Sequence, residues 1–131
     1  MFARKVSVRL LPNSLPRFST LMEGEILPWL RQQEGFLDLI TLAAPDGSEV
    51  ATISFWDQEG NAQLYNSSGY PQVLQVLEEL LDGIPYVKTF EVVSSTIHKL
   101  GQADTESPDA DDVVGENGSP PPGYQSYETS L

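Results

Sequence analysis

The richest run of chemically useful side chains in this sequence is FWDQEGNAQLYNSSGYP, residues 55–71. Within it, Trp56 offers a flat aromatic face and an indole N–H, which can stack on a planar molecule and donate a hydrogen bond to it. Tyr65 and Tyr70 each offer a phenol and Asn66 offers an amide, and these groups can polarise a substrate oxygen in general acid–base chemistry. We therefore take these four side chains as candidate catalytic residues.

The same residues also have structural interpretations that the sequence leaves open. Trp56 can be a buried aromatic of the core or of a dimer interface. Asn66, followed by Ser67 and Ser68, can cap a helix, since Asn and Ser are favoured at helix N-termini. The stretch is therefore predicted to join a strand to a helix, and its role as the wall of an active site is a hypothesis.

Two further candidates lie outside this stretch. Arg9 is the fifth candidate catalytic residue, because a guanidinium can hold an anionic or enolate substrate, although it can equally pair with Glu91 across a sheet. His98 is the one histidine of the sequence, and its reference pKa of about 6.5 suits proton transfer near neutral pH. Because only Lys99 stands beside it and no catalytic partner is evident, we interpret His98 as a solvent-facing residue at a strand end.

Composition narrows the chemistry. The 131 residues include no cysteine and one histidine, which excludes disulfides, thiol catalysis and thiolate metal sites. We expect neither a bound metal ion nor a cofactor. The formal net charge of −12 disfavours nucleic acid as a partner, and the seven basic residues form no run.

Composition also bounds the organisation of the chain. With 40% hydrophobic residues, the chain is predicted to form one folded domain over residues 1–100. No apolar run approaches the roughly 18 residues that span a bilayer, and the first residues are too interrupted for a secretory signal. We therefore expect no membrane association and a cytoplasmic location.

Residues 101–131 are predicted to be an acidic, Pro/Gly/Ser-rich tail that is disordered or extended. This segment holds seven acidic residues and no basic one, and it has few large apolar side chains with which to offset the entropy of ordering. It contains PPGY at residues 121–124 and ends in TSL, short patterns that resemble ligands of WW and PDZ domains. Because such short patterns arise by chance in tails of this composition, we assign them no role.

Hydrophobic patterns predict the strands that would position the candidate side chains. Residues 3–11 alternate between apolar and polar, which is typical of a strand. The apolar face of this strand carries Val6, Val8 and Leu10. Residues 36–57 are predicted to form a hairpin around the turn PDGS, and the segment from Pro85 onward supplies a last strand.

Two helices are predicted between these strands, from apolar residues at three- and four-residue spacing. The first begins after Asn13 or Ser14 as N-cap, and Pro28 is expected to kink it. The second runs from a capping site at residues 67–68 to a stop at Gly83. The resulting order β-α-β-β-α-β is the ferredoxin-like arrangement, an α+β fold with an antiparallel sheet.

The predicted sheet has apolar side chains on both faces. In the first strand of the hairpin, Leu37 and Leu39 fall on one side, and Phe36, Ile40 and Leu42 fall on the other. Two helices can cover only one face of a four-stranded sheet, so the second face would form an apolar patch of the kind that marks an interface. We therefore expect a homodimer whose sheets pack face to face.

Three features of residues 1–100 together resemble a known family. They are the first strand, the segment EILPWLRQQEGF in which a helix, a Pro and a Gly-Phe lead into a strand, and ATISFWDQEGNAQLY, in which a strand ends in Trp and runs into a polar helix. The chain resembles the antibiotic-biosynthesis-monooxygenase-like (ABM) group of the dimeric α+β barrel superfamily. The resemblance implies a dimeric α+β barrel with a pocket in each subunit between sheet and helices.

The haem-degrading relatives of this group differ from the present sequence. They need an Asn on the first strand and a haem-ligating His on the second helix. Here the first strand presents Lys5, Ser7 and Arg9, and the segment after Trp56 contains no His. Haem degradation is therefore not expected.

Two functional hypotheses remain. In the first, the chain is a cofactor-independent monooxygenase, and the protein orients an electron-rich aromatic substrate, deprotonates it and stabilises the developing oxyanion while it reacts with O2. In the second, the chain is a non-catalytic homodimer that binds a small apolar molecule or a protein partner. Fold alone does not separate them. A pocket in which Trp56 and polar groups converge would favour the first, and one filled by Phe18, Met22, Trp29 and Phe55 would favour the second.

Overall fold

The computed structural model describes residues 1–97. His98 and the acidic tail predicted over residues 101–131, with its PPGY and TSL patterns, lie outside the described residues. The expectations for those segments therefore stay predictions, and the fold below is that of residues 1–97.

A four-stranded antiparallel sheet is the centre of the fold, with the strand order β2-β3-β1-β4. The strands are β1 (Phe2–Arg9), β2 (Phe36–Ala43), β3 (Glu49–Trp56) and β4 (Tyr86–Glu91). The hairpin between β2 and β3 turns at Gly47, whose φ of 77° is the left-handed conformation that glycine adopts at little cost. Together with the helices between the strands, this order is ferredoxin-like, so the predicted α+β fold class is confirmed.

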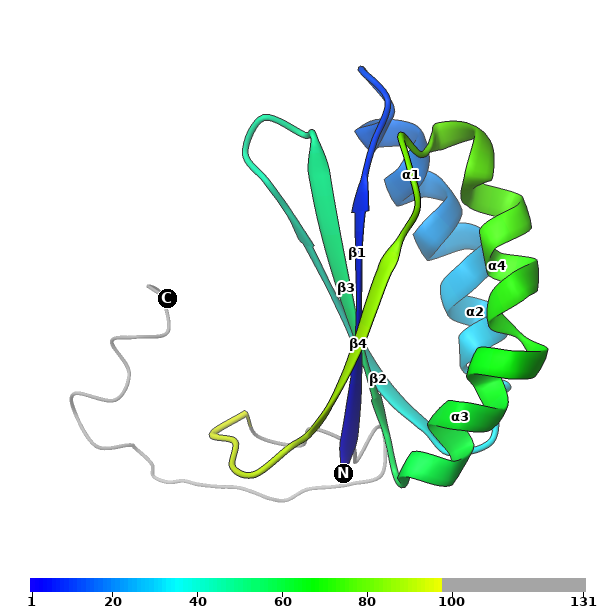
Figure 1. The fold of residues 1–131 in the computed structure, drawn as a ribbon, viewed down its shortest axis with the longest axis vertical. Helices are drawn as coiled ribbons and strands as arrows, with labels where there is room; N and C mark the ends of the chain where they lie inside the picture. Colours follow the sequence, from blue (N-terminus) through cyan, green and yellow to red (C-terminus); the bar gives the residue numbers. More distant parts are fainter. Residues whose placement is uncertain (98–131) are drawn as a thin grey trace. The chain divides into compact units, whose positions relative to one another are not determined.

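Two helical connections cover the same face of the sheet, as Figure 1 shows. The first consists of α1 (Leu15–Leu21), the π-helical segment η1 (Met22–Ile26) and α2 (Leu27–Leu30). The second consists of α3 (Glu59–Ser68), α4 (Tyr70–Leu77) and the 3₁₀ turn η2 (Glu78–Leu80). Of the two N-caps proposed for the first helix, Ser14 holds that position. Within residues 1–97, none of the helices is long and apolar enough to cross a lipid bilayer.

The segment just before Pro28, where a kink is expected, is the π-helical turn η1. The side chains of this connection that are buried at four-residue steps are Phe18, Met22, Ile26 and Leu30. In an α-helix with 3.6 residues per turn, each step of four residues carries the side chain about 40° farther around the axis. A π-helical turn holds more residues and takes up this drift. The N–H of Leu27 donates to the carbonyl oxygen of Met22, and the next residue, Pro28, has no N–H to donate.

The second helical connection begins earlier than predicted. Because α3 starts at Glu59, Asn66, Ser67 and Ser68 lie inside a helix and do not cap one. The hydroxyls of Ser67 and Ser68 donate to the carbonyl oxygen of Leu64 at 3.2 and 2.7 Å, so they are satisfied within the helix. The capping interpretation of these residues is therefore wrong.

A β-bulge near the start of β2 changes the face that Phe36 occupies. Phe36 and Asp38 lie opposite neighbouring residues of β3, which leaves Leu37 as the extra residue. Phe36 packs on the helix side, with its ring centroid 5.6 Å from that of Trp56. Strict alternation had placed Phe36 on the opposite side with Ile40, and the bulge is the physical reason for the difference.

The face of the sheet away from the helices also carries apolar side chains. The strand pairing places Ile40, Leu42, Ile53, Tyr86 and Phe90 on it. Leu42 is 52% exposed, Tyr86 64% and Phe90 44%. Large apolar side chains gathered in this way are typical of an interaction surface. We call these five residues the outer apolar face.

Candidate functional site

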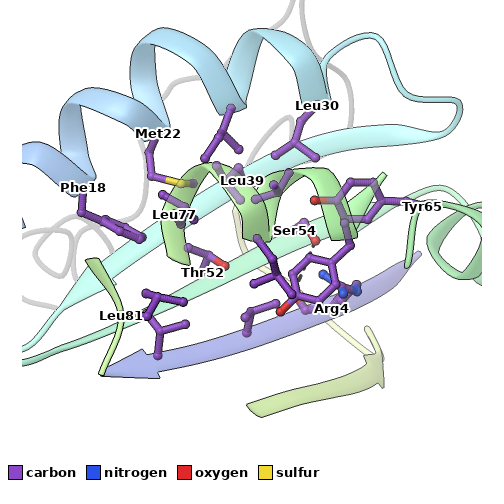
Figure 2. Close-up of a pocket in the computed structure, with 16 residues that line it drawn as sticks. Arg4, Phe18, Met22, Leu30, Leu39, Thr52, Ser54, Tyr65, Leu77 and Leu81 are labelled. Atoms are coloured by element: carbon purple, nitrogen blue, oxygen red, sulfur yellow. Dashed lines mark hydrogen bonds between the residues drawn. The ribbon is translucent and has the colours of Figure 1, made fainter. Parts of the chain in front are cut away.

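A cavity lies between the helices and the sheet face that they cover (Figure 2). Its enclosed volume is about 50 Å³. The empty space is about 540 Å³ when the gaps along its walls and its open mouth are included. In its present form it has room for a few water molecules. Strands β1 to β3 and helices α1 to α4 all contribute to its lining, so the cavity joins segments that are far apart in the sequence.

The cavity has a polar end and an apolar end. Figure 2 shows Arg4 and Tyr65 at one end, and Phe18 and Met22 at the other. Most of the remaining lining is valine, leucine and isoleucine, and Arg4 is the charged residue among the lining side chains. The cavity therefore presents one positive charge within a largely apolar surface.

Arg4 is the central polar residue of this site. It lies on β1 and is only 3% exposed. Its Nη2 donates a hydrogen bond of 2.6 Å to Oδ1 of Asn66 on α3. Its guanidinium carbon lies 4.1 Å from the ring centroid of Tyr70 and 5.2 Å from that of Tyr65, which is cation–π geometry. β1, α3 and α4 thus converge on one guanidinium.

Two buried polar atoms at this end have no hydrogen bond of full geometry within residues 1–97, although their two side chains, those of Arg4 and Tyr70, lie close to each other. The two atoms are Nε of Arg4 and the hydroxyl oxygen of Tyr70. Buried polar groups are nearly always hydrogen-bonded in folded proteins, so an unpartnered pair facing a cavity points to a ligand or to bound water.

Burial controls the protonation of the two tyrosines. It raises the pKa of Tyr65 to about 12 and raises the pKa of Tyr70 above its usual value, although the nearby charge of Arg4 opposes both shifts. Burial also lowers the pKa of Arg4, but a guanidinium stays charged at neutral pH because its reference pKa is so high. At pH 7 the site therefore holds one cation and two neutral phenols.

The structure brings together three of the five candidate residues. Tyr65 and Tyr70 line the polar end of the cavity, and Asn66 contacts it through Arg4. Trp56 lies behind this group: it is fully buried, and its ring stacks on that of Tyr65 at a centroid distance of 5.1 Å. It does not line the cavity, and its indole Nε1 donates to Oγ of Ser54 at 2.9 Å.

Arg9 lies away from the other candidates. Its Nη1 forms an ion pair of 3.0 Å with Oε2 of Glu49, and both side chains are 61% exposed. The partner expected across the sheet, Glu91, instead lies opposite Phe2 at the far end of β1. Arg9 belongs to the other face of the strand, because it is separated from Arg4 by an odd number of residues.

The same alternation contains the signal for the arginine that sequence analysis missed. Arg4 precedes Val6 by two residues, so it falls on the apolar, helix-covered face of β1. Ser54 is likewise two residues before Trp56 on β3. Because Arg4 lies on the same sheet face as these buried residues, the alternation alone predicts that its charge is inside the fold.

The described residues offer no evident metal centre. Within residues 1–97, no group of three or more His, Cys, Asp or Glu side chains lies close enough to hold a metal ion. The polar groups that converge on the cavity are a guanidinium, two phenols, an amide and two hydroxyls. Such groups recognise a ligand by hydrogen bonds and charge.

Solved structures of antibiotic biosynthesis monooxygenases share this ferredoxin-like fold. The chain is similar to the structure of a monooxygenase from the gene ActVA-Orf6 of Streptomyces coelicolor in complex with the ligand nanaomycin D. The TM-score is 0.64 at 21% identity, over 73% of this chain and 90% of that one.

Two further solved structures share the fold. One is a putative antibiotic biosynthesis monooxygenase from Deinococcus radiodurans, with a TM-score of 0.61 at 15% identity over 74% of this chain and 97% of that one. The other is NE2512 from Nitrosomonas europaea, a protein of unknown function, with a TM-score of 0.63 at 15% identity over 73% of this chain and 92% of that one. No protein-family model and no curated protein sequence matches the chain. The resemblance drawn from the sequence is thus confirmed at the level of the fold.

Proposed function

We propose that the chain is a homodimeric, cofactor-independent monooxygenase that acts on a small aromatic substrate in this cavity. The observation that carries the proposal is the placement of the Arg4 guanidinium beside the Tyr65 and Tyr70 rings, at the polar end of an otherwise apolar cavity. Apolar walls with a few convergent polar groups are the usual composition of a small-molecule site.

The proposed reaction needs two contributions from the protein. The apolar walls hold an electron-rich aromatic ring and exclude water. The positive charge of Arg4 favours the phenolate form of a phenol and so raises the electron density of the ring. O2 then adds to a ring carbon, and loss of water from the peroxide gives a quinone. For a phenol the balance is one phenol and one O2 to one quinone and one water, with one oxygen atom of O2 in each product.

The homodimer is part of the proposal. The outer apolar face leaves large side chains exposed, and a second copy packed on it would remove them from water. A shared face of this kind also leaves the cavity on the helix side of each subunit. The fold that the chain shares with solved antibiotic biosynthesis monooxygenases supports this proposal.

Two observations favour the second candidate function, a homodimer that binds a small apolar molecule without catalysis. The enclosed volume of the cavity is only about 50 Å³, and Phe18 and Met22 occupy its apolar end. The indole N–H of Trp56 is also already bonded to Ser54, so it is not free to act on a substrate.

Oxygen uptake separates the two functions. The purified protein is incubated with 1-naphthol in ¹⁸O2-saturated buffer, and O2 consumption and labelled 1,4-naphthoquinone are measured. The monooxygenase predicts saturable uptake of one O2 per quinone, with one labelled oxygen in the product. Arg4→Gln should lower the rate at least about tenfold, whereas Arg9→Gln, a change to an exposed arginine, should leave it unchanged. Uptake no faster than in buffer, for 1-naphthol and for related phenols, would favour the non-catalytic binder.

A further inference from the structure

We propose that the cavity takes its ligand as an anion: a carboxylate or phenolate carried on a flat apolar body, with Arg4 as its counter-ion. The inference deepens the proposed function by naming the charge of the ligand, and it rests on the same cavity. It holds for a bound substrate and for a ligand that is never turned over.

The first argument is the charge balance of the site. Arg4 is 97% removed from solvent, and within residues 1–97 it has no carboxylate partner, since the ion pair recorded there joins Arg9 to Glu49. The amide of Asn66 and the two tyrosine rings stabilise the guanidinium only with dipoles and quadrupoles. A buried charge is normally paired, so the missing partner is an anion.

The second argument is the supply of hydrogen-bond donors. Nε of Arg4 and the hydroxyl of Tyr70 have no hydrogen bond of full geometry in the described part of the chain, although the two side chains are close enough that Arg4 opposes the rise in the pKa of Tyr70. Both can donate, and a carboxylate or phenolate oxygen accepts without donating. Because burial keeps the pKa of Tyr70 above its ordinary value, its hydroxyl remains a donor at neutral pH and does not repel an anion.

The third argument is the shape of the remaining surface. Away from Arg4 the walls are aliphatic and aromatic, with Val6, Leu39 and Leu77 among them. A small hydrated anion such as phosphate would leave these walls in contact with water. A ligand with one anionic group and an apolar ring system fits both ends, and Met22, whose side chain is flexible, lies at the apolar end of the cavity.

Paired probes of equal size test the inference. 2-Naphthoate and 2-naphthamide share one ring system and differ in charge, and their binding to the full chain is measured by isothermal titration calorimetry at pH 7.5. We expect 2-naphthoate to bind at least about tenfold more tightly than 2-naphthamide, because the amide cannot neutralise Arg4. In Arg4→Gln this preference should fall to about twofold or less, while the affinity for 2-naphthamide changes little.

Two variants keep the test decisive. Arg9→Gln removes an exposed arginine and should retain the full preference for 2-naphthoate. Arg4→Lys keeps the charge but not the fork of donors, so it should show an intermediate preference, and it serves if Arg4→Gln does not fold. Equal affinity for the two probes, unchanged binding of 2-naphthoate by Arg4→Gln, or binding of neither probe would overturn the inference.

The outcomes also distinguish this inference from the proposed function. A charge preference that depends on Arg4, without oxygen uptake, would leave the anion site standing and remove the monooxygenase. Oxygen uptake with no preference for the anionic probe would support the monooxygenase and overturn the anion site. The two failures are therefore read from different measurements.

Discussion

Trp56 and Ser54 form a hydrogen-bonded pair inside the core, with indole Nε1 donating to the serine Oγ at 2.9 Å. The serine hydroxyl lies 3.4 Å from the carbonyl oxygen of Arg4, to which it donates in turn. Trp56 is fully buried and Ser54 is 6% exposed. The residue that ends β3 is thus connected through one hydroxyl to the strand that carries the buried arginine.

A double-mutant cycle should measure this pair. Ser54→Ala leaves the indole N–H without a partner and should lower the free energy of unfolding by about 1–3 kcal/mol. Trp56→Phe removes both the donor and part of a buried ring, with an expected loss of about 1–3 kcal/mol. The double variant should lose less free energy of unfolding than the sum of the two single losses, as measured by urea denaturation. Strict additivity would show that the hydrogen bond contributes nothing.

Alkaline pH should destabilise the fold through Tyr65. Its pKa is about 12 in the folded protein and near 10 in an unfolded chain, so the unfolded state loses the proton first. The resulting stability is fully present below pH 10 and is lost as the pH rises toward 12, by about 2–3 kcal/mol. Denaturation at pH 9 and 11.5 should show this loss, and Tyr65→Phe should reduce it. Tyr86→Phe, at an exposed tyrosine, is the control, and an equal effect there would contradict the prediction.

Two glycines of the second helical connection should respond in opposite ways to alanine. A Cβ on Gly69 would lie 2.8 Å from Trp29 and 2.9 Å from Tyr65, closer than carbon atoms pack. Gly69→Ala should therefore lower the free energy of unfolding by about 1–3 kcal/mol. Gly60→Ala meets nothing within 4 Å and should raise it by up to about 1 kcal/mol, because alanine favours the helix. Thermal denaturation of both variants checks the prediction, which fails if their midpoints shift in the same direction.

Removing the buried charge should stabilise the ligand-free protein. Arg4→Met replaces a guanidinium that has no carboxylate partner in residues 1–97 with an apolar side chain of similar length. We expect the free energy of unfolding to rise by about 1 kcal/mol, since the desolvation penalty exceeds the contacts that are lost. Arg17→Met, at an exposed arginine of α1, should change it by less than about 0.5 kcal/mol. A destabilised Arg4→Met would mean that Asn66 and the tyrosine rings compensate the charge in full.

A charge on the outer apolar face should prevent the proposed dimer. Ile53 lies on this face in the middle of β3, opposite Ile40 on β2 and Lys5 on β1. Ile53→Glu would bury a carboxylate in a dimer, so the variant should be monomeric by native mass spectrometry while the wild type is dimeric. Leu64 lies on the helix side and is 57% exposed, so Leu64→Glu should leave the protein dimeric. A monomeric wild type would contradict the dimer itself.

The fold could be predicted because its signals are local. Alternation in β1 and the PDGS turn between β2 and β3 each depend on a few neighbouring residues, and the structure has both elements. The departures depend on longer-range effects. The bulge at Leu37 depends on pairing with β3, and the π-helical turn accompanies the burial of Met22 and Ile26 in the core.

The candidate site was predictable only in part, for a similar reason. Tyr65 and Tyr70 could be selected from residue type, and both line the cavity. Arg4 and Arg9 are the same residue type on one strand, and only their phase relative to the buried stripe separates them. The relation of Arg4 to Asn66 spans 62 residues and depends on the packing of α3 over β1, which no local pattern contains.

The strand order has a consequence for how the chain is made. β1 is synthesised first, yet its neighbours in the sheet are the last two strands, and Phe2 pairs with Trp56 on one side and Glu91 on the other. A nascent chain therefore carries β1 with both edges unpaired until β3 is complete, and with one edge unpaired until β4 is complete. The side chains of α1 and η1 have no finished surface to cover before then. We expect folding during translation to wait until nearly all of this domain has left the ribosome.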